Sequence, residues 1–569
     1  MGQLHDVFEY IVDGTSGLAP GDVSGQALIA GVCSAGTVGK LYYLGKSSDL
    51  TGLLGVGPLV DALRDIFATA GQDAVVLACP VAGQSGGYIT DVIHVGEGPA
   101  AMVSGVPGGN ADVVVRIATA GAPGVATYAL SLDGGETFAA AVATPANGQI
   151  PCGASGATLV LGADNQVAGD TYQFAVRAPI GPISKIGTGP DITASGTPLA
   201  AAQVSLVITS GGKRNEGQYQ LSVDGGDNYG LSRTIPMDGA IAVGTSGVTV
   251  MMPADADFVL GDTYSFEVLA PAPTVVSVID AITVPLATVD PEFIYVVGPS
   301  DSVDWAALGA LMDTEFSKHR PKFVICEARE PQADEDIDDW VTALVQERTG
   351  YSHRFVCVVA AYGEISDQTG LTKRRNSAGL AVGRILSIPV MRALGRVRDG
   401  AVSQLALPST YTESHVATLE NAGFIPAKKY ASLQGTYWGE GKTLADATSD
   451  YQWIEVLRVV FKALRLLRIQ ALKSMYDEVG DPVVEGGAAG LAYLQGNLEI
   501  ALDSMVKAKP QELAGHVVYL PPNQDIVNNG VACEITLIGI PIIRKIKLYA
   551  SYVYAGSAFD PRLSDTASA

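Results

Sequence analysis

The sequence contains few of the residues from which catalytic and metal sites are usually built. Its 569 residues include six histidines and six cysteines, and only 17% of them are charged. No C-x-x-C pair is present, so we expect no zinc site, and cysteines scattered through apolar runs are typical of buried free thiols in a reducing cytoplasm. The histidines occur singly, and there is no G-x-S-x-G motif. We therefore predict no enzyme, no bound metal and no cofactor.

Positive charge and long apolar runs are also scarce. The formal net charge is −23, which disfavours contact with nucleic acid or anionic lipid. No run approaches the roughly 20 apolar residues that a membrane span requires. The first 14 residues lack the basic and apolar regions of a secretory signal. These absences predict a protein without nucleic-acid or membrane partners that is made in the cytoplasm without a signal peptide.

The clearest internal pattern is a duplication. The stretch "YALSLDGGETF" begins at Tyr128, and its counterpart "YQLSVDGGDNYG" begins at Tyr219. Around both, short alternating runs are separated by Gly, Asn, Asp and Pro, which is typical of small β-sandwiches. Two such domains are expected at 108–180 and 199–272, joined by a linker. Strands are predicted at 113–117, 171–176, 203–208 and 263–268.

Each repeat carries a motif similar to the Asp box of sialidase-type β-proteins. In the first repeat the motif comprises Ser131, Asp133, Gly135 and Phe138. The aspartate can cap a tight hairpin while the glycine adopts a left-handed conformation, so the motif predicts a turn. Arginines in these units are few and dispersed, unlike the cluster that would bind a sugar carboxylate. We therefore do not expect a glycosidase, and a carbohydrate-binding role for the modules remains an alternative.

Strands and helices alternate on both sides of the duplication. "ALIAGVCSAG" predicts a buried strand, "GPLVDALRDIFATAGQ" a helix and "DAVVLACPV" a second strand, and the alternation resumes at Asp304. Such alternation indicates an α/β layer whose strands are buried on both faces. The β units are therefore predicted to be insertions into a multi-domain α/β (α+β) fold.

The stretch Gly441-Lys442-Thr443 matches the end of a phosphate-binding P-loop. That loop requires a glycine five positions before Gly441, and Thr436 occupies the position. We therefore favour a loop between a strand end and a capped helix over a nucleotide site.

Two long helices are predicted next, at 450–475 and 485–506, followed by three strand-like runs. In the first helix, helical spacing predicts a core-facing side. Its members are Ile454, Leu457, Phe461, Leu464 and Ala471. A neighbouring side is basic, with Arg458, Lys462 and Arg465 in a stripe flanked by Arg468 and Lys473. The stripe is either a solvated helix face or a contact for an acidic partner.

Three segments of the α/β part resemble contractile-tail sheath proteins of phages and related injection machines. They are "ALIAGVCSAGTVGKLYYLGKSSDLTGLLG" with the helix and strand after it, "NAGFIPAKKYASLQGTYWGEGKTLADATSDYQWIEVLRVV", and "NNGVACEITLIGIPIIRKIKLYASYV". The resemblance implies a sheath core with inserted β domains. The expected divisions are an N-terminal arm at 1–25, core at 26–107, inserted domains at 108–180 and 199–272, core at 273–420, an inner tube-facing domain at 421–541, and a C-terminal arm and tail at 542–569.

The same resemblance implies a structural subunit that stacks as hexameric rings around an inner tube and contracts to drive that tube through a cell envelope. The implied partners are other copies of the chain, the inner tube protein, and baseplate and terminator proteins, in a virion tail or an injection particle. The alternative function is a surface-exposed β-module for binding or adhesion on another large assembly.

Sheath subunits add extended arms to the sheets of their neighbours, so both chain ends are candidate arms. The candidate arm residues are Phe8, Tyr10, Val12, Ile546, Leu548, Tyr549 and Tyr552. The basic stripe would contact the tube. For each arm the alternative is a strand within the subunit's own sheet.

Overall fold

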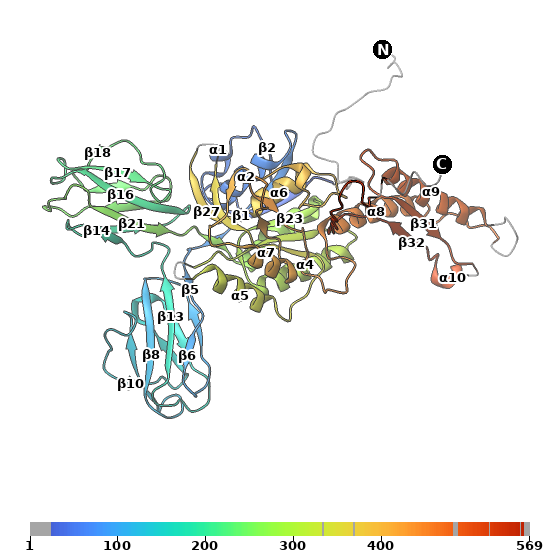
Figure 1. Ribbon diagram of the computed structural model, residues 1–569. Coiled ribbons are helices and arrows are strands. Elements are labelled where there is room, and N and C mark those ends of the chain that lie inside the picture. The colour runs from blue at the N-terminus through green and yellow to red at the C-terminus, as the bar shows by residue number, and fades with distance from the viewer. Residues whose placement is uncertain are drawn as a thin grey trace, which may run out of the picture.

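The computed structural model describes residues 24–332, 335–367, 370–481, 488–522, 524–557, 559–560 and 562. Figure 1 shows two β-sandwiches at the left and lower left, an α/β core in the middle and a smaller C-terminal unit at the right. The predicted multi-domain α/β fold is confirmed. Within the described ranges, no helix combines the length and apolar character needed to cross a bilayer.

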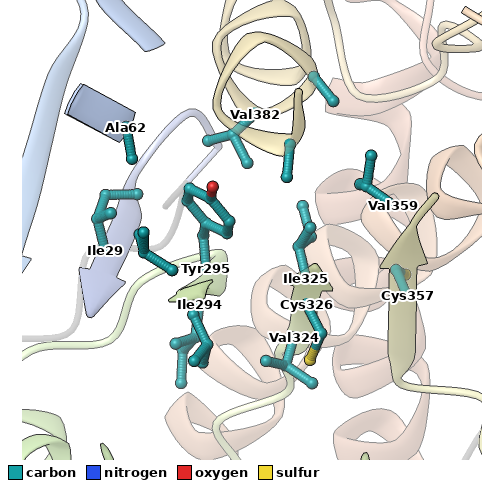
Figure 2. Packing of buried hydrophobic residues seen from close by; sticks show 14 of the residues in the cluster. Ile29, Ala62, Ile294, Tyr295, Val324, Ile325, Cys326, Cys357, Val359 and Val382 are labelled. Carbon is teal, nitrogen blue, oxygen red and sulfur yellow. The ribbon is translucent and has the colours of Figure 1, made fainter. Parts of the chain in front are cut away.

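A six-stranded sheet forms the centre of the core, in the order β2-β3-β1-β23-β24-β25. The strands are β2 (Tyr42–Gly45), β3 (Val75–Val81), β1 (Ala27–Val32), β23 (Phe293–Ser300), β24 (Phe323–Ala328) and β25 (Val356–Val359). Neighbours run parallel except for the edge strand β2. β1 pairs directly with β23 although both sandwiches lie between them in sequence. Figure 2 shows their side chains packed with those of β24 and β25 in one apolar core.

Helices cover both faces of this sheet, as expected for buried parallel strands. They are α2 (Pro58–Thr69), α3 (Val275–Thr288), α4 (Ser302–Ser317), α5 (Ile337–Arg348), α6 (Ala378–Ser387) and α7 (Glu413–Asn421). In Figure 1, α2 and α6 lie above the sheet, and α4, α5 and α7 lie below it. The contact of α6 with α2 requires a glycine, since a Cβ on Gly383 would come within 2.3 Å of the Ile66 carbonyl oxygen.

Short elements complete the core. They are α1 (Leu50–Leu54), β4 (Gly83–Gln84), β22 (Ala272–Pro273), β26 (Tyr362–Ser366), β27 (Thr372–Asn376), β28 (Leu405–Ala406), β29 (Ala427–Lys428), β30 (Tyr437–Trp438) and a 3₁₀ turn (Val397–Asp399). A second 3₁₀ turn, Gly153–Ser155, lies in the first sandwich. Cys79, Cys326 and Cys357 are buried free thiols in this core, and Cys152 is one in the first sandwich, whereas Cys33 and Cys533 are only half-buried.

The two inserted domains are sandwiches with the same plan. In the first sandwich, one sheet has the strand order β10-β9-β8-β13-β5, with β6 also paired to β13, and the other has the order β11-β12-β7. In the second sandwich, the two sheets have the orders β14-β21-β16-β17-β18 and β15-β20-β19. The first uses β5 (Tyr88–Ile89), β6 (Ile93–Val95), β7 (Met102–Gly105), β8 (Ala111–Thr119), β9 (Thr127–Ser131), β10 (Val142–Ala143), β11 (Gln149–Pro151), β12 (Ala157–Val160) and β13 (Thr171–Arg177). The second uses β14 (Ser184–Ile186), β15 (Thr193–Gly196), β16 (Ala202–Ser210), β17 (Gln218–Ser222), β18 (Arg233–Thr234), β19 (Ala240–Ala242), β20 (Val248–Met251) and β21 (Thr263–Val268). The four predicted sandwich strands correspond to β8, β13, β16 and β21.

The predicted boundaries of the sandwiches were too narrow. β14 and β15 lie in the segment expected to be a linker, yet they pair with β21 and β20. Likewise β5, β6 and β7 were assigned to the core, but they pair with β13 and β12. These strands are two to four residues long and rich in glycine neighbours, so their alternation is too brief to stand out in the sequence.

The Asp-box motifs form the hairpin turns that were predicted. Asp133 Oδ1 accepts hydrogen bonds from the Ser131 hydroxyl at 2.6 Å and the Thr137 amide at 2.9 Å, and Gly135 has a positive φ of 96°. These bonds hold the pKa of the Asp133 carboxyl below its usual range. In the second sandwich, Asn228 Nδ2 bonds Asp224 and also donates to the Gly370 carbonyl oxygen of the core at 3.3 Å. The second turn is therefore braced against the core.

The C-terminal unit contains α8 (Ile454–Lys473), α9 (Ala489–Val506), β31 (Gly515–Tyr519), the short helix α10 (Ile526–Asn529) and β32 (Glu534–Ile538). Both long helices and two of the three predicted strands are confirmed. The third run, Ile543 to Tyr554, forms no strand. The expected side-chain cap of the first helix is also absent at Trp453. Leu464 is 38% exposed, so its prediction as a core residue was wrong.

One half-buried acid near the end of β24 makes stability depend on pH. Glu327 accepts a hydrogen bond from the Tyr295 hydroxyl, and burial raises its pKa from 4.5 to about 7. A carboxyl with a raised pKa binds more protons in the folded state than in the unfolded state. Its contribution to the free energy of unfolding is therefore present at low pH and is lost as the pH rises from about 4.5 to about 7.

We expect Glu327→Gln to abolish that loss, because the amide stays neutral. Relative to the wild type, the variant should gain about 2–3 kcal/mol in unfolding free energy between pH 4.5 and pH 8. Urea denaturation at both pH values measures this, with Glu136→Gln in an exposed turn as the control. A constant difference between Glu327→Gln and wild type at the two pH values would contradict the assignment.

Candidate assembly surfaces

Helix α8 is buried on two sides, and this burial determines which residues of the predicted basic stripe can be exposed. Ile454, Leu457 and Phe461 belong to the main core, whereas Val459 and Ala463 pack in a separate cluster with α9 and β31. Arg458 lies four residues after Ile454 and three before Phe461, and therefore on the core side of the helix. Its Nε donates to Glu292 Oε1 at 2.5 Å, and its side chain is 2% exposed.

Arg465 is also internal. Its Nε donates to Asp290 Oδ2 at 3.1 Å. The same aspartate contacts Lys322 Nζ at 3.1 Å, and Lys322, which is fully buried, contacts Glu315 at 3.0 Å. Arg465, Asp290, Lys322 and Glu315 thus form a run of alternating charges that joins α8 to the end of α4 and to the segment just before β23. Glu315 also pairs with Lys318 at 2.9 Å. Such a network balances the desolvation of each member.

The prediction of an exposed basic stripe is therefore wrong for Arg458 and Arg465. Lys462 is mostly buried and bonds Glu512 Oε1 at 2.9 Å. Only the flanking residues Arg468 and Lys473 are exposed. The error has a physical cause: the helix-wheel positions of Arg458 and Arg465 matched those of the core residues, and the acids that neutralise them are distant in sequence. The segment Asp290-Pro291-Glu292, directly before a buried strand, was the available signal.

The Gly441–Thr443 loop is not built to hold a nucleotide. The Thr443 hydroxyl donates to the Tyr451 carbonyl oxygen at 2.8 Å, and its amide donates to the Gln452 carbonyl oxygen at 2.9 Å. Thr443 is buried, so neither group can reach a magnesium ion or a phosphate. The loop instead joins β30 to α8, as predicted.

The C-terminal segment is attached at one residue and exposed beyond it. Arg544 bonds Glu455 at 2.5 Å and Glu440 at 3.2 Å, and its guanidinium lies 4.2 Å from the centre of the Trp453 ring. After this clamp, Ile546 is 72% exposed and Leu548 is 89% exposed. Tyr549 and Tyr552 are similarly open, and residues 545–554 belong to no strand. Arg544 was not predicted to be an attachment point.

A two-stranded ribbon lies in the same unit. β31 and β32 pair antiparallel, and within the described residues no third strand joins them. Val517, Tyr519 and Ile538 on this ribbon are 47–52% exposed. A two-stranded ribbon with open edges can pair with a further strand. The other candidate arm, with Phe8, Tyr10 and Val12, lies outside the described residues.

The fold and these surfaces define a class: a multi-domain α/β protein with two inserted sandwiches and a C-terminal unit that contains a two-stranded ribbon. Comparison with known protein families identifies the family to which the chain belongs. Residues 4–442 match the family described as DUF2586, N-terminal domain, and residues 450–557 match DUF2586, C-terminal domain. The chain belongs to the DUF2586 family.

One named relative comes from a phage. The chain is 31% identical over 112 residues to a protein of Haemophilus phage HP1 (strain HP1c1) that carries the provisional name of tail sheath protein, a match that covers 18% of this chain and 30% of the relative. This match confirms the resemblance predicted from the sequence segments.

Solved structures of sheath proteins are also similar at low identity. The sheath tail protein of Desulfitobacterium hafniense aligns at 11% identity and a TM-score of 0.40, over 95% of this chain and all of the other. That of Listeria innocua aligns at 9% identity and a TM-score of 0.38, over 91% of this chain and 96% of the other.

Removing Arg458 tests the internal role of the stripe. We expect Arg458→Met to lower the unfolding free energy by about 3–5 kcal/mol, because Glu292 would be left buried and unpaired. Exposed Arg468→Met should change it by less than about 0.5 kcal/mol. The double variant Arg458→Met/Glu292→Gln should recover part of the loss. Equal effects of the two single variants in urea denaturation would show that Arg458 is not the buried partner.

Proposed function

We propose that the chain is a structural, non-catalytic subunit of a contractile tail sheath. Its copies stack as hexameric rings around an inner tube, and contraction drives the tube through a cell envelope. The particle is a phage tail or an injection machine, assembled from subunits made in the bacterial cytoplasm, with baseplate and terminator proteins at its ends. Membership of the DUF2586 family and the match to the phage HP1 protein support this proposal.

The observation that carries the proposal is the exposed C-terminal segment. Burying the large apolar side chains of Ile546, Leu548, Tyr549 and Tyr552 would contribute on the order of 1.5–3 kcal/mol each, yet in the single chain they are 72–89% exposed. A monomeric protein with net charge −23 would gain nothing from such a segment. Pairing with a sheet edge of a neighbouring copy would bury these side chains and satisfy the backbone.

The β31–β32 ribbon is the proposed acceptor, because it offers open edges and exposed apolar side chains. The clamp at Arg544 would fix where the arm leaves its own subunit. Backbone ladders depend little on side-chain identity, so linked subunits could rotate relative to one another while remaining joined. Arms of this kind would let a cylinder shorten without falling apart. The N-terminal arm would contribute in the same way.

Truncation after Arg544 tests the arm. The full-length chain should form hollow striated cylinders in negative-stain micrographs, and the truncated chain should remain a small particle in sedimentation. Thermal unfolding of the two should match, because residues 545–554 contribute no strand to the subunit. Truncation after Ser557 is the matched control and should still assemble. Cylinders of normal appearance from the chain truncated after Arg544 would contradict the proposal.

Contact with the inner tube is proposed for Arg468 and Lys473 only. Both are exposed on the last part of α8, and Lys473 Nζ bonds just the neighbouring Gln470 at 3.1 Å. Exposed ion pairs contribute only about 0.2–1 kcal/mol each, so repetition around each ring would be needed to hold the tube.

Reversing both charges, with Arg468→Glu and Lys473→Glu, should prevent co-assembly with the tube protein and leave tube-free cylinders intact. Lys213→Glu with Arg233→Glu, the same charge change on the second sandwich, should have no effect. Co-sedimentation with the tube protein measures the difference, and unaltered co-assembly of the α8 variant would exclude these residues.

The sandwiches support a second, compatible role in surface binding or adhesion. They project away from the C-terminal unit in Figure 1, so they would lie at the outside of a sheath whose inner surface is the C-terminal unit. If surface binding were the chain's whole function, the purified protein would stay monomeric in the micrographs described above.

A further inference from the structure

A polar cavity beside the Gly441–Thr443 loop is the clearest feature that assembly does not explain. Its volume is about 380 Å³, and three separate segments line it. The end of α5 supplies Arg348, the end of α7 supplies Asn421, and the loop before α8 supplies Lys442, Asp446 and Gln452. The cavity lies within one chain, so the inference is independent of the proposed sheath.

Two of these lining residues are cations without an ion-pair partner. Arg348 Nη2 donates to the Leu444 and Ala445 carbonyl oxygens at 3.0 and 3.4 Å, and its buried Nε has no acceptor. In the described part of the chain, neither Arg348 nor Lys442 forms an ion pair. Asp446 is the acid in the lining, and its Oδ1 is occupied by the Thr448 amide and hydroxyl at 3.0 and 2.8 Å.

This arrangement differs from that of the most deeply buried cations. Acids outnumber bases by 59 to 36, and several enclosed cations meet a carboxylate, whereas buried Arg384, like Arg348, donates to backbone carbonyl oxygens. Lys322, Arg375, Arg458 and Arg465 are examples, with carboxylate oxygens at 2.5–3.1 Å. Burial lowers the pKa of Arg348, and the attraction of the Asp446 carboxylate offsets this effect only in part. An anion in the cavity would offset the cost of enclosing these charges.

We propose that the cavity binds a small molecule through an oxyanion, a phosphate or carboxylate group held between the Arg348 guanidinium and the Lys442 ammonium. Both groups recognise such oxygens through charge-assisted hydrogen bonds. The volume exceeds that of a single phosphate, and Asn421 supplies an amide for the rest of the molecule. Gln452 can offer only its side-chain oxygen, because its Nε2 already donates to the Ala447 and Ser449 carbonyl oxygens at 2.7 and 2.9 Å. The occupied amide and hydroxyl of Thr443 exclude the P-loop mode for the same ligand.

Calorimetric titration of the full-length chain tests the site, with inorganic phosphate and citrate as separate probes at matched ionic strength. Saturable binding at a single site per chain is expected for at least one probe. Lys442→Gln should weaken it by about tenfold or more, since a charge-assisted bond is lost. Lys213→Gln removes the same charge at an exposed position of the second sandwich and should leave binding unchanged.

The two probes identify the source of the oxyanion. Binding of phosphate alone assigns a phosphate-bearing ligand, and binding of citrate alone assigns a carboxylate; either result supports the site. Thermal unfolding of Lys442→Gln should match wild type, because Lys442 is half-exposed. Absence of binding by both probes, or equal weakening by Lys442→Gln and Lys213→Gln, would overturn the proposal.

Discussion

Buried ion pairs between helix α8 and the segment that enters β23 hold the C-terminal unit against the core. Arg458 meets Glu292 and Arg465 meets Asp290, and all four side chains are less than a tenth exposed. Charges removed from water are stable only opposite a partner, so the two parts cannot separate without leaving charges unpaired. The positions of the open ribbon and of the Arg544 clamp follow from this attachment, because both belong to the unit that α8 anchors.

The inserted sandwiches obey a different constraint. The central sheet is completed by β1 pairing with β23, and neither strand needs the sandwiches to form that pairing. The core can therefore carry two extra domains on one side while the C-terminal unit occupies the other (Figure 1). The second sandwich contacts the core through Asn228, and the equivalent position of the first sandwich is Thr137, which bonds only within its own turn. The two copies thus share a plan but differ in how they are held.

Much of this fold could be predicted from the sequence, because periodicity and turn residues are local signals. The strand at Ala27–Val32, the helices α8 and α9, and the Asp-box turns all came from such signals. The short strands β14 and β15 were missed because they span only three and four residues. They form strands because they pair with β21 and β20, and a pairing between segments that are distant in the chain has no local signal in the sequence.

The candidate site was less predictable, because its chemistry depends on long-range partners. Arg458 and Glu292 are far apart in the chain, so the sequence alone could not show that the basic stripe is neutralised internally. The exposed Ile546 to Tyr552 run was found because a row of β-forming residues is visible locally. The attachment of this run at Arg544 was not found, because Glu440 and Glu455 contact Arg544 only in the folded chain.

Amide hydrogen exchange over residues 545–554, compared between dispersed full-length chain and assembled cylinders, tests the strand-exchange proposal most directly. In the dispersed chain these amides have no strand partner, and we expect fast exchange. In cylinders we expect strong protection, because a neighbouring sheet would accept their hydrogen bonds. Fast exchange in both states would contradict the proposal that this segment joins one subunit to the next.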